Sequence, residues 1–255
     1  MSDTVLYTEG LTVRFGGLTA VNNVTLDCNR GELTGLIGPN GAGKTTFVDA
    51  VTGFLPDNSS GSVQIDGTEV FGRPAHLLAH AGLSRTWQTL ELFDDISVRS
   101  NLDVASRLLT VRGAVRDFFR PTEREDRVEE TLALLGLTEL ANRQPVELSQ
   151  GQRKLVGVGR ALVASSTKIL LLDEPAAGLD KTETAWFGQQ LRELVGKGYT
   201  MLLIDHDMGL VLNVCDRIHM LVFGELVTSG TPEEIRGNPD VIAAYLGHSV
   251  DSSNG

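Results

Sequence analysis

The sequence predicts an α/β fold whose central sheet is mostly parallel and is interrupted by an inserted group of helices. Short apolar segments alternate with helical segments in residues 1–89 and again in residues 160–230, the pattern of strands joined by crossover helices. Between them, residues 90–159 have mainly helical patterns. The composition, with 41% hydrophobic and 22% charged residues, is ordinary for a globular protein. The chain of 255 residues is long enough for one large domain with an insertion.

Before the insertion, period-two and continuous apolar runs predict strands, and a glycine or proline marks each helix end. Strands are predicted at residues 5–15, 21–27, 33–38 and 63–67, the last after a turn "DNSSGS", and helices at residues 44–53 and 73–82.

Within the insertion, helices are predicted over residues 101–109 and 124–136, with a charged connector at 112–126. The alternation then resumes with strands at residues 169–175, 199–205, 217–224 and 225–230 and helices at 182–196 and 209–216. Residues 231–255 form a tail. Thr231 and Glu234 make a capping box there with Pro232 at the first helical position, residues 238–247 predict a last helix, and residues 248–255 are expected to be disordered.

Charge and hydropathy exclude several classes of protein. The net charge of −11 gives no electrostatic footprint for nucleic acid or anionic lipid. No apolar run approaches the length of a membrane span, and the first residues lack the basic and apolar regions of a signal peptide. Cys28 and Cys215 are isolated, as expected of reduced, inert cysteines in a cytosolic protein.

The segment "GPNGAGKTT" satisfies G-x-x-x-x-G-K-[ST] and lies between an apolar strand and a helix, which predicts a phosphate-binding loop. Its backbone N–H groups would surround phosphate oxygens, Lys44 would reach the β- and γ-phosphates, and Thr45 would hold Mg²⁺. The alternative is a glycine-rich turn before a helix. The candidate ATP-binding residues of this loop are Gly38, Pro39, Asn40, Gly41, Ala42, Gly43, Lys44, Thr45 and Thr46.

Two further strands deliver acidic and imidazole groups at their carboxyl ends, where ligands of α/β sheets bind. After residues 169–172, Asp173 would bind Mg²⁺ and Glu174 would polarise a water for attack on the γ-phosphate; solvated acids at a strand end are the alternative. In "LLIDHDM", His206 would donate a hydrogen bond to the γ-phosphate, with a metal-binding D-H-D or a surface histidine as alternatives. Gln88 in "LSRTWQ" would contact Mg²⁺ or the attacking water, or is an ordinary surface residue.

The polar stretch "ELSQGQRK" has a simple interpretation of its own. Ser149 with Gln152 fits S-x-x-Q, a capping box that satisfies the first N–H groups of a helix.

Taken in order, the phosphate loop, Gln88, "LSQGQ", "LLLDEP", "GLD" and "LIDHD" resemble an ABC-type ATPase, and the resemblance covers almost the whole chain. It implies a RecA-like P-loop NTPase core sheet (residues 1–89 and 160–230) with an N-terminal antiparallel β subdomain. A helical subdomain (90–159) is inserted, and a short helical tail (231–255) follows. It also implies a head-to-tail dimer with two ATP molecules, and Mg²⁺, at the interface.

The resemblance also assigns roles to single residues. Phe15 takes the position of the aromatic that stacks on adenine, although the strand pattern alone would point it inward. Glu174 matches the catalytic glutamate, His206 the switch histidine and Gln88 the hinge glutamine beside the helical insertion. Asp180 matches the loop that crosses to the partner subunit. Ser149, Gln150, Gly151 and Gln152 match the signature segment, which would face the γ-phosphate held by Lys44 of the other subunit.

Within that family, "VRFGGLTAVNNVTL", "LANRQPVELSQGQ", "AAGLDKTET" and "GTPEEIRGNPDVIAAYLG" resemble the ATPases of branched-chain amino acid importers. Urea importers and lipopolysaccharide-export ATPases share much of this pattern. Two residues depart from it. Gln150 replaces the glycine common in the signature segment, and Asp180 stands where close relatives often have Asn.

The implied partners are a second ATPase subunit, identical or different, two membrane-spanning permease subunits and, indirectly, an extracytoplasmic solute-binding protein. The implied location is cytoplasmic, peripheral on the inner face of the plasma membrane. Two other function classes compete: a soluble ABC ATPase acting on DNA or ribosomes, and a non-hydrolysing nucleotide-binding regulator. The acidic, single-cassette chain lacks the basic arm or tandem domains of the former, so no nucleic-acid partner is expected. Only the altered signature segment suggests the latter.

Overall fold

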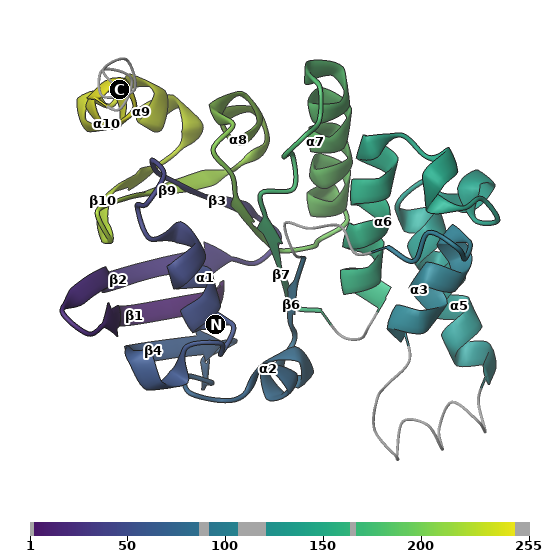
Figure 1. Cartoon of the computed structure of the whole chain (residues 1–255), viewed down its shortest axis with the longest axis horizontal. Helices are drawn as coiled ribbons and strands as arrows, with labels where there is room; N and C mark the ends of the chain where they lie inside the picture. The colour runs from purple at the N-terminus through teal and green to yellow at the C-terminus, as the bar shows by residue number, and fades with distance from the viewer. Residues whose placement is uncertain (1–2, 87–91, 107–120, 164–166, 248–255) are drawn as a thin grey trace.

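The structure is a computed structural model that describes residues 3–86, 92–106, 121–163 and 167–247 (Figure 1). Its strands form two sheets, and helices surround them. Gln88, residues 112–120 of the expected connector and the expected disordered tail at 248–255 lie outside these ranges. The predicted helix over residues 124–136 begins earlier than expected, because residues 121–123 of the expected connector are the first residues of helix α5.

The larger sheet is the predicted, mostly parallel one. Its strand order is β10-β9-β3-β8-β7-β6; all neighbouring pairs are parallel except the hairpin between β9 and β10. The strands β3, β7 and β8 are buried along their whole length, which explains why their sequences are mostly apolar. The bounds are β3 (Leu33–Ile37), β6 (Leu83–Arg85), β7 (Ile169–Asp173), β8 (Met201–Ile204), β9 (Arg217–Val222) and β10 (Glu225–Gly230).

The smaller sheet is antiparallel, in the order β2-β1-β4-β5, and shares a hydrophobic core with one face of the larger sheet. Helix α1 (Lys44–Val51) contributes Phe47 and Val48, both fully buried, to this core. An N-terminal antiparallel β part is therefore present as expected. The bounds are β1 (Thr4–Phe15), β2 (Leu18–Asn29), β4 (Ser59–Ile65) and β5 (Thr68–Glu69).

One predicted turn is wrong in its extent. The expected turn over residues 57–62 is shorter, because a 3-10 helix, η1 (Pro56–Asn58), is followed directly by β4 from Ser59. Ser59 and Ser60 pair with β1 although their composition is typical of a loop. Gly61 permits the close pairing, because a Cβ there would lie 2.9 Å from backbone oxygens of β1 at a φ of +120°.

The inserted helices form a group at one end of the larger sheet (Figure 1). They are α3 (Val98–Ser106), α5 (Pro121–Leu134) and α6 (Gln150–Val163), with 3-10 turns η2 (Thr138–Leu140) and η3 (Pro145–Glu147) between the last two. Gly159 lets α6 approach its neighbours, because a Cβ there would lie 2.9 Å from both Leu102 and Leu135. The expected domain boundary between residues 159 and 160 falls inside α6, so this helix continues from the insertion toward the core.

The remaining helices cover the sheets and form the tail. They are α2 (Ala75–Ala81), α7 (Lys181–Gly196), α8 (Met208–Val214), α9 (Pro232–Gly237) and α10 (Pro239–Gly247). The predicted capping box at the start of α9 is confirmed, with Thr231 and Glu234 bonding reciprocally. Within the described ranges, the helices are all too short or too polar to cross a bilayer.

The close contact at Gly159 yields a prediction about stability. Replacing Gly159 with Val inserts three carbons between α6, α3 and α5, and should lower the free energy of unfolding by about 1–3 kcal/mol. The matched control is Gly196→Ala at the end of α7, where a Cβ meets nothing within 4 Å, so stability should stay equal or rise. Urea denaturation measures both. Equal midpoints for the two variants would contradict this account of the packing.

Candidate nucleotide site

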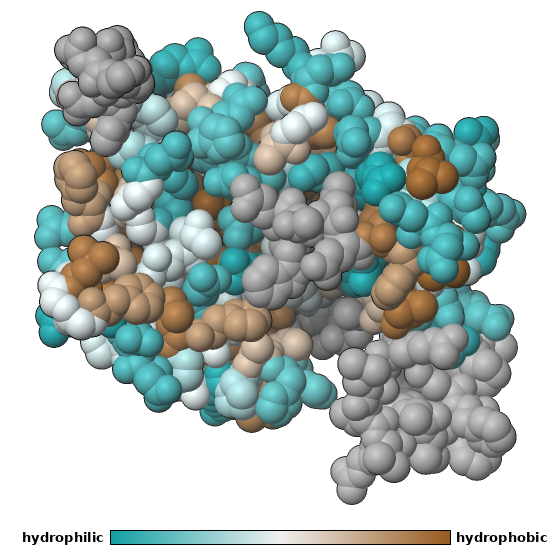
Figure 2. All heavy atoms as spheres, in the orientation of Figure 1, coloured by the Kyte–Doolittle hydropathy of each residue, from teal (hydrophilic) through white to brown (hydrophobic). Residues whose placement is uncertain are grey.

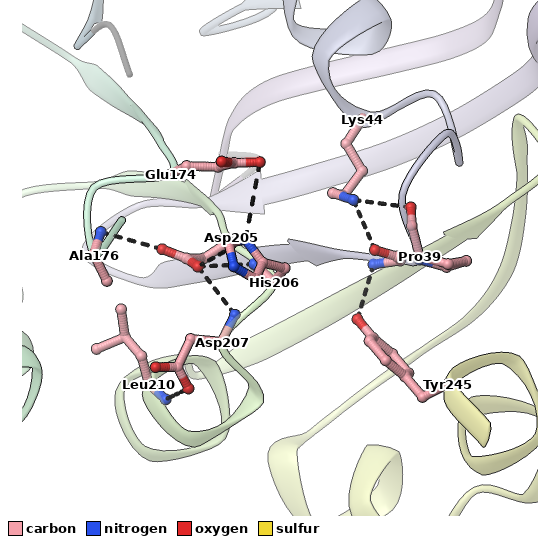
Figure 3. A network of polar contacts seen from close by, with 10 residues as sticks. Pro39, Lys44, Glu174, Ala176, Asp205, His206, Asp207, Leu210 and Tyr245 are labelled. Carbon is pink, nitrogen blue, oxygen red and sulfur yellow. Dashed lines mark hydrogen bonds and ion pairs between the residues drawn. The ribbon is translucent and has the colours of Figure 1, made fainter. Parts of the chain in front are cut away.

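The predicted phosphate loop follows β3 and runs into α1, with Lys44 at the first helical position (Figure 3). The Lys44 ammonium turns back onto its own loop, where Nζ donates to the carbonyl oxygens of Gly38 at 2.7 Å and Pro39 at 3.1 Å. Phosphate oxygens would be able to replace these carbonyls as acceptors. The loop thus holds a cation where a phosphate would bind.

The charge of Lys44 is set by opposing effects. Burial of the side chain lowers the pKa of the ammonium. The nearby carboxylates of Glu174, Asp205 and Asp173 act in the opposite direction, because they stabilise the charged form. The lysine and these carboxylates therefore form one electrostatic group at the carboxyl edge of the sheet.

Two glycines of the loop are required by close contacts on its rear side. A Cβ on Gly38 would lie 2.1 Å from the Leu221 carbonyl oxygen of β9, and one on Gly43 would lie 2.4 Å from the Ala20 carbonyl oxygen of β2. Gly41 has a φ of +78°, and a Cβ there would meet nothing within 4 Å, so the outer side of the loop is open. The loop is therefore packed against β9 and β2 on one side and has free space at Gly41 on the other, which fits a loop that binds phosphate.

Asp173, predicted as a Mg²⁺ ligand, lies at the end of β7 and is paired with a buried arginine. Its Oδ2 is 2.7 Å from Nη2 of Arg85 in β6, and the side chains are 8% and 7% exposed. Nη1 of Arg85 also reaches Oδ1 of Asp49 in α1, at 2.6 Å, and Oγ1 of Thr52, at 3.1 Å. Arg85 therefore ties together the loop-bearing helix and two strands of the sheet.

Arg85 and Asp49 belong to the site although neither lies in a motif that the sequence predicts to be functional. The structure supplies the reason, since Arg85 is a charged residue in β6, which pairs with β7, a strand that is buried along its whole length and ends with Asp173. Such a residue needs a buried partner of opposite charge.

Glu174 directly follows β7 and has a left-handed backbone, with a φ of +44°. Its N–H donates to the Ile204 carbonyl oxygen of β8 at 2.7 Å, which holds the unusual conformation in place. The Glu174 side chain is 23% exposed, and its Oε1 lies 4.0 Å from Nδ1 of His206. The sheet thus brings the predicted catalytic glutamate and switch histidine together.

Asp205 fixes the turn that carries His206 (Figure 3). It is 1% exposed, and its carboxylate accepts hydrogen bonds from the backbone N–H groups of Ala176, His206 and Asp207. Asp207 caps α8 by accepting from the Leu210 N–H at 3.1 Å. Because both carboxylates serve backbone groups, the alternative of a metal-binding D-H-D is not supported, and the described residues contain no cluster of three or more His, Cys, Asp or Glu suited to a metal.

The signature segment, Ser149 to Gln152, begins α6 and has the predicted capping box. The Ser149 N–H donates to Gln152 Oε1 at 3.0 Å, and the Gln152 N–H donates to Ser149 Oγ at 3.3 Å. Ser149 and Gln150 are exposed. Gly151 is buried against α7, where its N–H donates to Glu183 and a Cβ would lie 3.3 Å from the Trp186 ring. Within one subunit, the segment therefore presents its first two residues to solvent.

Phe15 and Asp180 have roles assigned by resemblance, and the structure shows the surroundings of each within its own chain. Phe15, at the end of β1, is 42% exposed and pairs with Leu18, so the inward orientation suggested by the strand pattern is wrong. Apolar side chains gather on the side of the molecule where β1, β2 and β10 lie (Figure 2). Asp180 accepts hydrogen bonds from the N–H groups of Thr182 and Glu183, both at 2.8 Å, and so caps α7 within its own chain.

Cys28, Cys215 and His219 are not part of the candidate site. Cys28 and Cys215 are free and buried, and burial raises the pKa of both thiols, that of Cys28 to about 12. Both are therefore protonated at neutral pH, as inert cysteines are. His219 is buried between Ser229 and the Asp27 carbonyl oxygen, a structural role.

Sequence comparison identifies the class of protein that this fold and site define. The family described as "ABC transporter" matches residues 21–177, and the description "Branched-chain amino acid ATP-binding cassette transporter" matches residues 225–251. The chain belongs to the ABC transporter family of ATP-binding proteins. Such a protein binds adenine nucleotide and hydrolyses ATP to drive transport, and it acts as a dimer with membrane permease subunits.

The relatives make the assignment more specific. The chain is 42% identical to the high-affinity branched-chain amino acid transport ATP-binding protein LivG of Salmonella typhimurium, over 98% of this chain and 100% of the relative. It is 41% identical to the corresponding protein BraF of Pseudomonas aeruginosa, with the same coverage. The Archaeoglobus fulgidus protein described as a probable LivG is 32% identical, over 95% of each chain.

Solved structures of ATP-binding cassettes have the same fold as this chain. A nucleotide-free ATP-binding cassette from an ABC transporter superposes with a TM-score of 0.82 at 31% identity, covering 95% of this chain and 98% of the other. The ADP conformation of an ATP-binding cassette of an ABC transporter gives 0.84 at 30% identity, covering 96% and 100%. The expected α/β cassette fold is confirmed.

The buried Arg85 network yields a second prediction. Replacing Arg85 with Ala leaves the carboxylate of Asp173 buried without this cation, and should lower the free energy of unfolding by about 3–5 kcal/mol. The control is Arg30→Ala, which breaks the more exposed pair with Asp66 and should cost less than about 1 kcal/mol. Chemical denaturation of both proteins tests the difference. Similar losses in the two variants would show that burial does not set the strength of the Arg85 pairs.

Proposed function

We propose that this chain is the ATP-hydrolysing subunit of a transporter that imports branched-chain or other hydrophobic amino acids. The observation that carries the solute class is the match of residues 225–251 to the branched-chain description, together with relatives of that name along nearly the whole chain.

In the proposed site, the loop from Gly38 to Thr46 surrounds the phosphates of ATP and Phe15 stacks on adenine. The Lys44 ammonium exchanges its carbonyl acceptors for phosphate oxygens. Its closeness to Glu174 supports this, because both would then face the γ-phosphate. Glu174 orients the attacking water, and His206, 4.0 Å away, stabilises the charge that develops on the phosphate.

The donors available for a metal fit Mg²⁺ rather than a softer ion. The Thr45 hydroxyl and the Asp173 carboxylate are hard oxygen ligands, and we propose that they hold Mg²⁺ with Gln88. Bound there, the ion would neutralise charge on the β- and γ-phosphates. Arg85 supports the same role by fixing the Asp173 carboxylate at the end of β7.

We further propose that a second ATPase subunit, identical or different, completes each site. The exposure of Ser149 at the start of α6 supports a contact in trans with ATP bound at the Lys44 site of the partner. Asp180 would lie in the loop that crosses to that partner. The inserted helical subdomain, moving with Gln88, would transmit closure to two permease subunits, which would place this chain on the cytoplasmic face of the membrane. A solute-binding protein would deliver the amino acid from outside.

The function is tested by measuring uptake. The chain, co-purified with the permease and binding-protein subunits of its own transporter and placed in proteoliposomes, should import labelled leucine in proportion to ATP hydrolysis. The Lys44→Ala variant should neither import leucine nor hydrolyse ATP. Stimulation of hydrolysis by urea with no response to leucine would redirect the proposal to the related amide importers.

Replacing Glu174 with Gln gives a third prediction. The amide keeps the size of the side chain but cannot accept the proton of the attacking water, so phosphate release should fall at least about a hundredfold. ATP binding should be unchanged, and a nucleotide-loaded dimer should accumulate in size-exclusion chromatography. The control, Glu193→Gln, makes the same chemical change on the exposed side of α7 and should leave turnover as in the wild type. Unchanged turnover in the Glu174 variant would refute the assigned role.

Replacing Gln150 with Gly gives a fourth prediction. Gln150 is exposed at the first position of α6, and we propose that its side chain points away from the nucleotide of the partner. Turnover should therefore change less than about threefold, equivalent to less than about 0.7 kcal/mol. A gain of about tenfold or more in steady-state phosphate release would mean that Gln150 impairs the natural site.

A further inference from the structure

The C-terminal helix α10 contacts the phosphate loop through one hydrogen bond. The hydroxyl oxygen of Tyr245 accepts from the N–H of Gly38 at 3.2 Å, across 207 positions of the sequence (Figure 3). Gly38 is the first residue of the phosphate loop, and Tyr245 lies in the segment that matches the branched-chain description. The contact thus joins the tail to the nucleotide site directly.

Tyr245 is held firmly enough to act as an anchor. Its ring packs against the hydrophobic core that also contains Val241 of α10 and Ile235 of α9, which are 5% and 1% exposed. Burial raises the pKa of the phenol, so the hydroxyl is neutral at physiological pH. The oxygen therefore meets the Gly38 N–H as an uncharged acceptor from a fixed side chain.

Gly38 is constrained on three sides. Its N–H is bound by Tyr245, its carbonyl oxygen accepts from Lys44 Nζ at 2.7 Å, and the space for a Cβ is filled by the Leu221 carbonyl oxygen. Of these contacts, only the bond to Lys44 has to be exchanged when phosphate arrives. Because the Gly38 N–H is bound by Tyr245, we expect the N–H groups further along the loop to donate to phosphate, so that the tyrosine contact can persist while Gly38 remains the first residue of the loop.

We propose that Tyr245 is a positioning residue for the nucleotide site: its hydroxyl holds the start of the phosphate loop in place while Lys44 changes acceptors. The loop then needs less ordering when nucleotide binds, so the tail contributes to affinity without touching the ligand. This inference rests on the proposed function for the identity of the ligand, but the contact itself exists without nucleotide.

Tyr245→Phe removes one oxygen and leaves the packed ring, so it tests this role. The dissociation constant and the KM for MgATP should rise about fivefold, equivalent to about 1 kcal/mol, while kcat stays within about twofold. In the nucleotide-free protein, hydrogen exchange of the peptide covering residues 33–43 should become faster. Tyr199→Phe is the matched control, since Tyr199 is another half-buried tyrosine packed on the same core, and both readouts should stay as in the wild type.

The outcomes separate the inference from the function. Unchanged exchange in Tyr245→Phe would refute the contact, and faster exchange with unchanged affinity would refute its positioning role. A similar loss of affinity in Tyr199→Phe would show a general effect of core tyrosines and would also overturn the proposal. If the wild-type protein bound ATP without hydrolysing it, the proposed function would fail, whereas exchange and affinity would still decide the role of Tyr245.

Discussion

The parallel alignment of β3, β8 and β7 is the constraint on which the rest of the site depends. Ile204 of β8 pairs with Leu36 on one side and with Asp173 on the other, so three segments far apart in the sequence end at one level. The phosphate loop, Glu174 and Asp205 directly follow the carboxyl ends of these strands. Because these strands are buried on both faces, their charged groups lie at or just beyond the strand ends. Backbone pairing thus decides where the chemistry is located.

The buried charges of the site mainly position other groups. Asp205 holds three backbone N–H groups, and Arg85 holds Asp49 and Asp173. The side chains proposed to contact ligand differ in exposure: His206 is 58% exposed, whereas Lys44 and Asp173 are buried. The buried hydrogen bonds and ion pairs supply the fixed geometry that phosphoryl transfer requires.

The sequence predicts the parts of the site that are contiguous in the chain and misses those that are not. The phosphate loop, Glu174 and His206 each follow an apolar strand, so periodicity and spacing locate them. The Arg85–Asp173 pair and the Tyr245–Gly38 contact join residues 88 and 207 positions apart, and no local pattern encodes such pairings. Ser59 and Ser60 have the composition of a turn, yet pairing with β1 makes them a strand. Phe15 has a strand pattern, yet its place at the hairpin end exposes it.

The left-handed backbone of Glu174 has a consequence for how this chain evolves. A glutamate at a φ of +44° is less favourable there than glycine or asparagine would be, so the local backbone preference acts against the residue that the proposed chemistry needs. Substitutions that relieve this conformation would make the fold more stable and the protein inactive. Selection for stability alone would therefore favour replacement of Glu174, whereas selection for the proposed hydrolysis would retain it.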